Sequence, residues 1–295
     1  MHRDWGAIFA EIGPKPNVYG RLPRTAGCAR GKAPWRNDCP HSGLLMSEQV
    51  KKYKKYKKPP IVEAVIEVRF VKPLEERKIE KLVSKMKSEF TIQRIEEVGL
   101  RVSVEEISGL QAEAKTRLAG YKLVNNADSA IIVQIKQDAI SISRLPPYEG
   151  WPNLLAEFKK YYDWYTNKNF KTLSRIGVRY INRIDIPRMD GNIKLEHYFK
   201  IYPHTPKKNF PALISFSVQS VTAIDNDRVL TIHVHESDNS PLLNHGSFVL
   251  DLDVAQSENL PVNNTQLFEM LDEMRDKKNF FFEDLLTPKC KRLFN

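Results

Sequence analysis

The chain holds few cysteines and no long apolar segment. Its 295 residues include only three cysteines, Cys28, Cys39 and Cys290, and none has the spacing and neighbouring histidines of a zinc finger. We therefore expect a reducing, cytoplasmic setting without a disulfide scaffold. No stretch approaches the roughly 18 apolar residues of a membrane-spanning helix, and residues 1–45 lack the apolar centre of a secretory signal.

The common enzyme signatures are also missing. The sequence has no Walker-type glycine loop, no glycine-rich dinucleotide fingerprint, no Gly-x-Ser-x-Gly elbow and no His-Glu-x-x-His. These absences argue against the frequent enzyme classes, although an unusual enzyme stays possible. We expect neither a cofactor nor a resident metal ion.

What the chain does have is an uneven distribution of charge. The formal net charge is +10, but residues 1–45 hold seven Lys or Arg against three Asp or Glu, and residues 46–60 hold six Lys against one Glu. The remainder, residues 61–295, is close to neutral, with 33 basic and 32 acidic side chains. A basic chain indicates a nucleic-acid or membrane partner, but here that indication applies only to residues 1–60.

Residues 1–45 differ from the rest in composition. They contain six of the 13 glycines and two of the four tryptophans, without a sustained apolar period that could order them by burial. We expect this segment to be a disordered or non-native leader, with Met46 as the native initiator.

A lysine-rich tail follows at residues 46–60, and its charges form a short repeat. The lysines of the repeat are Lys51, Lys52, Lys54, Lys55, Lys57 and Lys58. One interpretation is a solvated tail that ends at Pro59-Pro60. The other is an electrostatic tether for phosphate groups, with Tyr53 and Tyr56 available for stacking on bases.

The first half of the remaining chain predicts one strand, one helix, four strands and a second helix. Residues 61–71 alternate apolar and polar side chains, which is typical of a half-buried antiparallel strand. Residues 74–90 switch to helical periodicity. Strands are expected at about 99–107, 111–124, 130–137 and 139–145, and Trp151-Pro152 opens the second helix.

The second half repeats this order. A long strand is expected at 175–186, a short helix at 195–202, strands at about 213–224, 228–236 and 246–254, and a helix at 265–277. The predicted fold class is therefore α+β. We expect two tandem β-α-β(3-4)-α units, residues 61–172 and 173–295, which share a curved antiparallel sheet with helices on one face.

Three stretches stand out as motifs: PPIVEAVIEVRF at Pro59–Phe70, YEGW at Tyr148–Trp151 and RIGVRYINRI at Arg175–Ile184. In this order and spacing they resemble a sporadically distributed prokaryotic family of uncharacterised proteins of about 250 residues. The resemblance runs from Pro59 to the C-terminus and leaves residues 1–45 uncovered. It implies a domain boundary near Pro59 and brings no established activity.

The polar sides of the predicted strands supply the candidate functional residues. They form a candidate ligand or partner face made of Glu63, Glu67, Arg69, Arg179, Arg183, His233, His235, Asp251 and Asp253. One interpretation is a solvated sheet surface, with Glu63 and Glu67 paired to Arg179 and Arg183. The other is a charged surface whose arginine forks receive a ligand or partner.

Two residues break the alternation of the long strand at 175–186. Asn182 falls on the apolar side, so its amide is expected to bond a neighbouring strand. Gly177 in mid-strand indicates a bulge or the close approach of another element.

The leading functional hypothesis is a non-enzymatic cytoplasmic binding module whose partner is another protein, with homodimerisation as an option. The first alternative is a nucleic-acid-binding protein that uses the basic tail. The second is a hydrolase or nucleotide-processing enzyme, since a His-x-His strand beside an Asp-x-Asp strand is a pattern that can bind a divalent metal.

Overall fold

A computed structural model describes residues 55–105, 109–189, 191–204, 213–225, 227–237 and 240–295, with side chains throughout except at 100–115. All described residues lie in the second of the two units of the chain, residues 52–295. The expectations for residues 1–45, and for Lys51, Lys52 and Lys54, fall outside the described residues.

The described chain forms one antiparallel sheet of nine strands in the order β2-β3-β4-β5-β1-β6-β9-β8-β7. Every pair of neighbouring strands is antiparallel. The strands are β1 (Ile61–Phe70), β2 (Phe90–Glu105), β3 (Gly109–Asn125), β4 (Ile131–Lys136), β5 (Ala139–Arg144), β6 (Leu173–Pro187), β7 (Ser217–Ala223), β8 (Arg228–Glu236) and β9 (His245–Gln256). The predicted α+β class with a large antiparallel sheet is confirmed.

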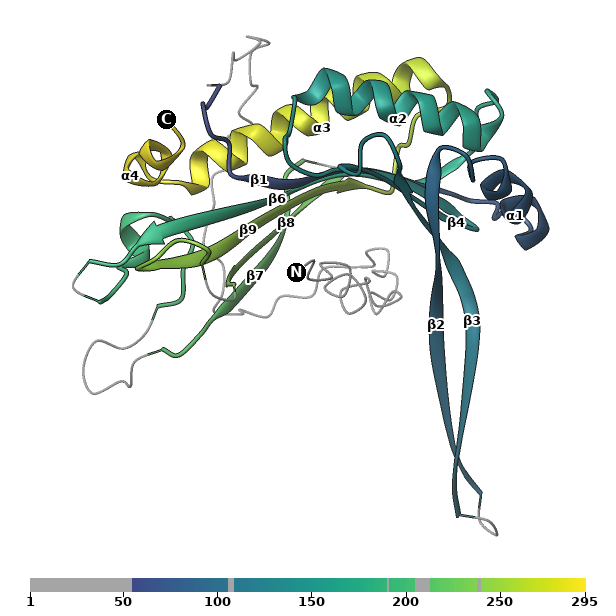
Figure 1. Ribbon diagram of the computed structural model, residues 1–295, viewed down its shortest axis with the longest axis horizontal. Coiled ribbons are helices and arrows are strands. Elements are labelled where there is room, and N and C mark those ends of the chain that lie inside the picture. Colours follow the sequence, from purple (N-terminus) through teal and green to yellow (C-terminus); the bar gives the residue numbers. More distant parts are fainter. Residues whose placement is uncertain (1–54, 106–108, 190, 205–212, 226, 238–239) are drawn as a thin grey trace, which may run out of the picture. The chain divides into compact units, whose positions relative to one another are not determined.

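Four α-helices accompany the sheet in the described residues: α1 (Glu76–Ser84), α2 (Trp151–Thr166), α3 (Asn264–Leu285) and α4 (Pro288–Lys291). The two long helices, α2 and α3, lie side by side on one face of the sheet, and the ends of the sheet bend away from them (Figure 1). Among the described residues, no helix is both long and apolar enough to cross a lipid bilayer.

The core lies between the two long helices and the apolar face of the sheet. From α2 it takes Phe158, Tyr161 and Tyr162, and from α3 it takes Leu267 and Leu271, all of them buried. Each such side chain contributes on the order of 1.5–3 kcal/mol by leaving water. The alternation predicted for residues 61–71 and 175–186 is what directs one face of β1 and β6 into this core.

Tyr148, just before α2, and Trp151, its first residue, also hold the helix to its neighbours. The hydroxyls of Tyr148 and Tyr180 are 2.7 Å apart, and Trp151 Nε1 donates to Asp272 Oδ1 at 2.5 Å. Asn182 is buried, and its Nδ2 donates to the carbonyl oxygen of Leu250 on β9 at 3.0 Å. The neighbouring-strand bond expected for Asn182 is therefore present.

Several predicted boundaries differ from the structure. The first helix ends at Ser84 and β2 already begins at Phe90, because residues 90–95 pair with β3 and extend the strand that was expected from 99. The helix expected at 195–202 is a single 3-10 turn, Leu195–His197. Conversely, α3 continues to Leu285, since Phe282 adds another buried turn.

Strands β2 and β3 extend well beyond the rest of the sheet (Figure 1). β3 pairs with β4 only over Gly120–Val124, whereas it pairs with β2 along its whole length. A Cβ on Gly120 would lie 2.2 Å from the carbonyl oxygen of Ile135, so only glycine fits where the two-stranded part leaves the sheet. We call residues 96–105 of β2 and 109–118 of β3 the arm.

Candidate functional site

The candidate residues predicted from the sequence lie on one face of the sheet, opposite α2 and α3. We call this the open face; its strands are β1, β6, β8 and β9 at the centre and one end of the sheet. Strand pairing sets Arg179 opposite Asp253, and Asp253 opposite Thr231. It also sets His233 opposite Asp251. Because directly paired residues share a face, the structure brings these side chains together.

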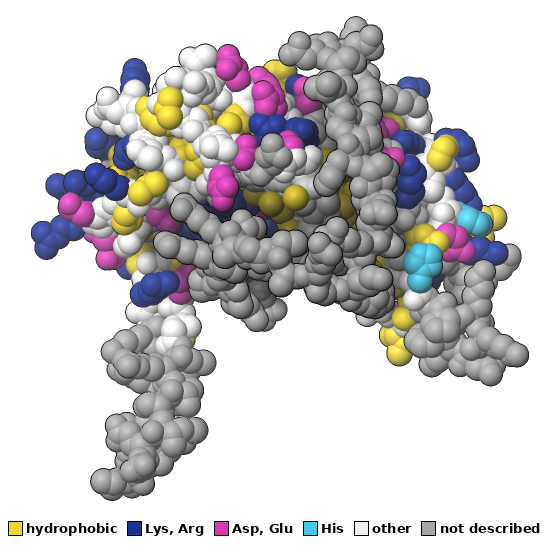
Figure 2. Space-filling model, turned by 180° about the vertical axis from the view of Figure 1, so that it is seen from behind, with side chains coloured by type: hydrophobic (Ala, Val, Ile, Leu, Met, Phe, Trp, Pro, Cys, Tyr) yellow, Lys and Arg dark blue, Asp and Glu magenta, His cyan; other side chains and the backbone are white. Residues whose placement is uncertain are grey.

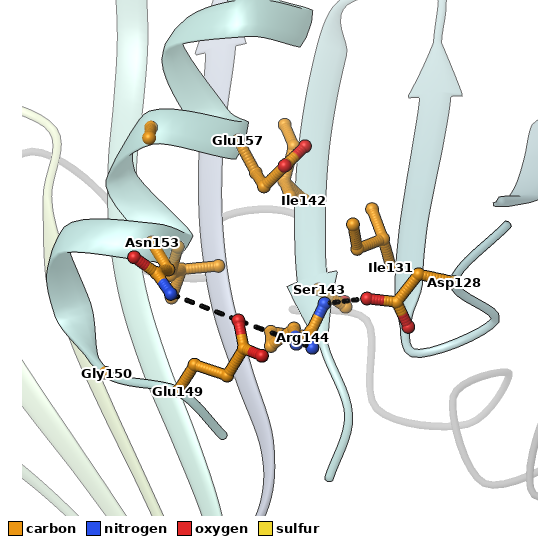
Figure 3. A pocket seen from close by; sticks show the side chains of 11 residues that line it. Asp128, Ile131, Ile142, Ser143, Arg144, Glu149, Gly150, Asn153 and Glu157 are labelled. Atoms are coloured by element: carbon orange, nitrogen blue, oxygen red, sulfur yellow. Dashed lines mark hydrogen bonds and ion pairs between the residues drawn. The ribbon is translucent and has the colours of Figure 1, made fainter. Parts of the chain in front are cut away.

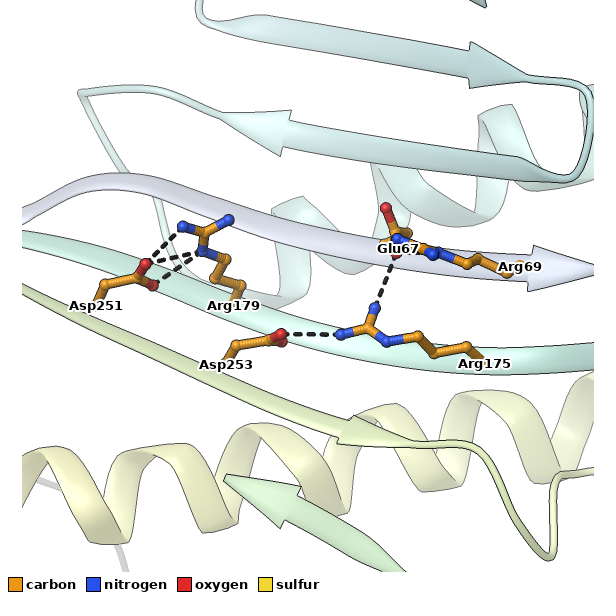
Figure 4. Close-up of polar contacts among 6 residues, drawn as sticks. All are labelled: Glu67, Arg69, Arg175, Arg179, Asp251 and Asp253. Atoms are coloured by element: carbon orange, nitrogen blue, oxygen red, sulfur yellow. Dashed lines mark hydrogen bonds and ion pairs between the residues drawn. The ribbon is translucent and has the colours of Figure 1, made fainter. Parts of the chain in front are cut away.

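A chain of ion pairs crosses the centre of the open face (Figure 4). Glu67 Oε1 accepts hydrogen bonds from Arg69 Nε and from Arg175, each at 2.8 Å. The other terminal nitrogen of Arg175 donates to Asp253 Oδ2, also at 2.8 Å. Arg175 therefore links β1 to β9 across β6, although it was not among the principal candidates.

A second ion pair lies further along β6. Arg179 donates from Nε and a terminal nitrogen to both carboxylate oxygens of Asp251, with distances of 2.5 to 3.1 Å. This forked arrangement is the strongest geometry available to an arginine and a carboxylate. Asp251 is almost fully buried, so removal of Arg179 would leave its charge without this partner.

The expected pairing is wrong for Glu67, and Glu63 does not lie directly opposite either Arg179 or Arg183, although the charge of Arg179 acts on it. In the register of β1 and β6, Glu67 lies opposite Gly177 and Glu63 lies opposite Ile181. Because of this register, the arginine of β6 that forms an ion pair with Glu67 is Arg175. Sequence alternation determines the face of each residue, but it contains no information on register between strands that lie far apart in the chain.

Gly177 explains how Arg175 reaches two carboxylates. A Cβ on Gly177 would lie 2.7 Å from a terminal nitrogen of Arg175, so the guanidinium group occupies the space above the glycine. The register of β1 and β6 is regular at this position, so Gly177 does not mark a bulge. The close approach expected there is made by a side chain of the same strand.

Burial changes the acidity of two carboxyl groups on the open face. Desolvation raises the pKa of Glu63, although a hydrogen bond from Ser143 and the charge of Arg179 act in the opposite direction. Desolvation also raises the pKa of Asp253, against the charges of Arg175 and Arg179. The charges of the arginines therefore offset part of the desolvation cost of burying these carboxylates on the open face.

The two histidines lie on β8 beside these ion pairs. Ser217 Oγ is 2.7 Å from His233 Nε2, and the rings of His233 and His235 stack with centroids 4.5 Å apart. Burial and the neighbouring His233 lower the pKa of His235. The carboxylates that a metal site would need are bound to arginines, and among the described side chains no three metal-ligating groups gather at one point.

Arg183 lies further toward the end of β6. Its Nε is 3.5 Å from Asp185 Oδ1, and Asp185 also accepts a hydrogen bond from Ser240 Oγ at 2.8 Å. The arginines at positions 175, 179 and 183 thus each have an acidic partner on the open face. The open face therefore carries many charged side chains, but their positive and negative charges nearly cancel.

The described part of the lysine tail contradicts one role considered for it. Tyr56 donates its hydroxyl to Glu283 Oε1 at 2.8 Å and packs edge-on against Phe294. Its ring is therefore part of the contact with the C-terminal helices and is not available for stacking on bases. Lys55, Lys57 and Lys58 are exposed.

A small cavity of about 220 Å³ lies between α2 and strands β4 and β5, on the side of the sheet opposite the open face (Figure 3). At its floor Arg144 bonds to Asp128 and to the carbonyl oxygen of Pro147, and it lies 3.7 Å from Glu149. This volume is below the roughly 300 Å³ at which small-molecule sites begin. Sequence reasoning missed Arg144 because it continues the apolar positions of β5.

No protein-family model matches the chain, and a search of the curated proteins finds no match either. The fold and the geometry of the open face are therefore the basis for assigning a function.

Proposed function

We propose that the protein is a non-enzymatic binding module whose open face receives another protein. The observation that carries this proposal is the row of ion pairs from Glu67 through Arg175 to Asp253, together with Arg179 and Asp251. These forks are held in place by their neighbours before a partner arrives. A preorganised polar surface loses little side-chain entropy on binding and can set the orientation of a partner.

The mixture of charges on this face favours a protein over a nucleic acid. Each arginine has a carboxylate partner, so the field that a phosphate backbone would meet is largely cancelled. Basic and acidic side chains are also interspersed over the visible described surface in Figure 2. A partner whose surface carries complementary positive and negative charges fits such a face. A partner that places like charges against each other is repelled.

We also propose that the fold arose by duplication and belongs with the prokaryotic family that its motifs resemble. Counted outward from the central pair, the strands run β1, β5, β4, β3, β2 on one side and β6, β9, β8, β7 on the other, so the two sides match except for the additional β2. In each half a long helix follows the strand next to the centre, α2 after β5 and α3 after β9. This order supports the two units at residues 61–172 and 173–295. We further propose that the protein is cytoplasmic.

A photo-crosslinking residue placed on the open face would test the binding function in the native host. Thr231 of β8 lies directly opposite Asp253 of β9, and its substitution leaves the ion pairs in place. Glu269, exposed on α3, is the matched control on the other side of the sheet. We expect discrete protein adducts from position 231 and none of the same mass from position 269.

Two results would overturn the proposal. One is an identical set of adducts from positions 231 and 269, which would mean that the open face has no specific partner. The other is that adducts from position 231 contain nucleic acid, which would favour the alternative in which the lysine tail and the face bind nucleic acid together.

A further inference from the structure

Strand β7 forms one of the two edges of the sheet (Figure 1). It pairs with β8 on one side, and the register is regular from Ser217 to Ala223 without a shift. On its other side, no described residue forms a hydrogen bond with the backbone of β7. The outer side therefore presents a row of N–H and C=O groups, which is a template for pairing with another extended chain.

Two hydrogen bonds to β8 determine which groups point outward. Glu236 N donates to the carbonyl oxygen of Phe216 at 3.2 Å, and Ile224 N donates to the carbonyl oxygen of Arg228 at 3.0 Å. In a regular antiparallel pair the backbone groups of successive residues point alternately to the two sides. The outward N–H and C=O groups of β7 therefore belong to Ser217, Gln219, Val221 and Ala223.

The side chains of β7 do not block this edge. The strand reads SVQSVTA, without a charged residue or a proline. Gln219 is exposed, and Val221 is 64% exposed. Sheets usually protect an edge against pairing by means of a charged side chain, a proline or a bulge. Strand β7 has none of these devices.

The opposite edge of the sheet is protected in this way. Strand β2 carries Arg94, Glu96 and Glu97, all of them exposed, and its register with β3 shifts between Ile95 and Glu96. Charges and an irregular register both hinder the addition of a strand. The contrast between the two edges indicates that the free edge of β7 has a use.

We propose that β7 binds an extended segment of a partner protein as an additional strand of the sheet. An extended polypeptide offers N–H and C=O groups at the spacing of the outward groups of β7, whereas a nucleic-acid backbone offers no such alternation. This inference rests on the proposed function in one respect, namely that the partner is a protein. It adds the form in which that partner binds.

The added strand continues the open face. The residues of β7 with outward backbone groups also direct their side chains to the open face, since Val221 lies directly opposite Thr231 of β8. Val229 of β8 lies directly opposite Ala223 and is 39% exposed. This corner of the open face is therefore apolar, in contrast to the ion pairs at its centre.

The apolar corner determines the chemistry of the segment that binds. The described side chains of Val221, Ala223 and Val229 are uncharged, so a charged side chain placed against them loses water without gaining a partner. A β-branched or other apolar side chain gains contact with Val221 instead. The segment that fits is extended and uncharged, with an apolar residue facing Val221.

Photo-crosslinking combined with a backbone substitution tests this inference in the native host. The crosslinking residue replaces Ala223, at the edge, and the chain carries either Gln219→Pro or Gln219→Ala. Proline removes the outward N–H and places its ring where the added strand would lie, while the bonds to β8 come from other residues. Alanine keeps the N–H and removes only the side chain, so it is the matched control.

We expect position 223 to give the same protein adduct as position 231 of the open face. Gln219→Ala should change the adduct yield by no more than about twofold, as is usual for an exposed side chain. Gln219→Pro should lower it at least about tenfold, because a carbonyl group of the partner loses its donor. Thermal melts show whether each variant is folded.

A second pair of variants applies if Gln219→Pro does not fold. Val221→Lys adds the charge with which natural edges prevent pairing, and Val221→Thr keeps a β-branched side chain of similar size. Loss of the adduct with lysine and its retention with threonine would support the added strand. Equal yields from these two variants would contradict it.

The other outcomes separate this inference from the proposed function. Adducts from position 231 without adducts from position 223, or equal yields from the proline and alanine variants, would refute the added strand and leave the open face as the binding surface. Adducts from position 223 alone, lost with proline, would support the strand and contradict the open face. Adducts that join two copies of this chain, or none from either position, would overturn the assignment to a partner protein.

Discussion

Lys278 is a charged residue in the core. It lies on the buried side of α3 with its Nζ 3.4 Å from the centre of the Tyr180 ring, and it donates to Asn279 Oδ1 at 2.7 Å. Burial lowers its pKa from 10.5 to about 7, and the nearby charge of Arg275 acts in the same direction. The contact with the ring offsets only part of the cost of removing an ammonium group from water.

Lys278→Met should therefore stabilise the protein at neutral pH. The unfolded chain binds a proton at Lys278 up to about pH 10.5, whereas the folded chain releases it above about pH 7. The cost of Lys278 is thus complete at and below pH 7 and declines as the pH rises toward 10.5. We expect the free energy of unfolding to rise by about 2–4 kcal/mol at pH 7 and by much less at pH 10, measured by chemical denaturation.

Lys277→Met is the control for this prediction. Lys277 is the next residue, half-exposed, and its Nζ pairs with Asp225 at 2.9 Å. Its substitution should cost under about 1 kcal/mol, with little change between pH 7 and pH 10. A gain from Lys278→Met that is independent of pH would show that packing, rather than the charge, determines the effect.

Gly177 offers a test of the ion-pair row without removing a charge. In Gly177→Ala the new Cβ displaces the Arg175 guanidinium from Glu67 and Asp253. We expect a loss of about 1 kcal/mol in the free energy of unfolding, since these partners are half-buried.

The reason for this loss can be checked in a double-mutant cycle. In an Arg175→Ala background the obstruction is gone, and Gly177→Ala should be neutral or stabilising, because alanine is preferred to glycine in a strand. Equal costs in both backgrounds would mean that the backbone at Gly177, and not Arg175, opposes a side chain.

At the scale of elements, the arm is separable from the sheet that carries it. Its strands pair with each other, and β3 contacts β4 only over Gly120–Val124. The open face and the core therefore do not depend on it. An element with so few neighbours belongs to the least stable part of a protein.

We predict that replacing residues 97–117 by Asn-Gly leaves the melting temperature within about 3 °C of the wild type. In the wild type, amide hydrogens of 96–105 should exchange with solvent faster than those of Gly120–Val124. A large drop in melting temperature would mean that the arm supports the sheet.

At the scale of the whole molecule, the net charge of the full chain differs from the net charge of residues 61–295, which form the sheet and helices. Nearly all of the excess of +10 resides in residues 1–60, whereas the rest is close to neutral and its open face is paired. Any attraction to nucleic acid should thus come from the lysine tail.

We predict that nucleic-acid binding is weak and is abolished when the six lysines at 51–58 are replaced by serine. Before replacement, the affinity should fall with salt with a log–log slope on the order of five, because each neutralised phosphate releases a counterion. Fluorescence anisotropy with a labelled duplex measures both. Tight binding that survives the replacement would contradict this prediction and would indicate that the open face binds nucleic acid.

The sequence by itself determined the class of the fold and the face on which the residues of β1 and β6 lie. Alternation in residues 61–71 and 175–186 is a local property of the chain, so it predicted β1, β6 and the side on which Glu67 and Arg179 lie. It also identified Asn182 as a buried amide. These features depend on neighbours within a few positions, which the chain order contains.

Only the tertiary structure decided which charges meet. The pairing of Glu67 with Arg175, the position of Arg175 above Gly177 and the burial of Lys278 against Tyr180 depend on strand register and helix packing. The length of β2, and with it the arm, was also missed. Register between distant strands is set by the sum of many packing contacts, and no local pattern of residues encodes that sum.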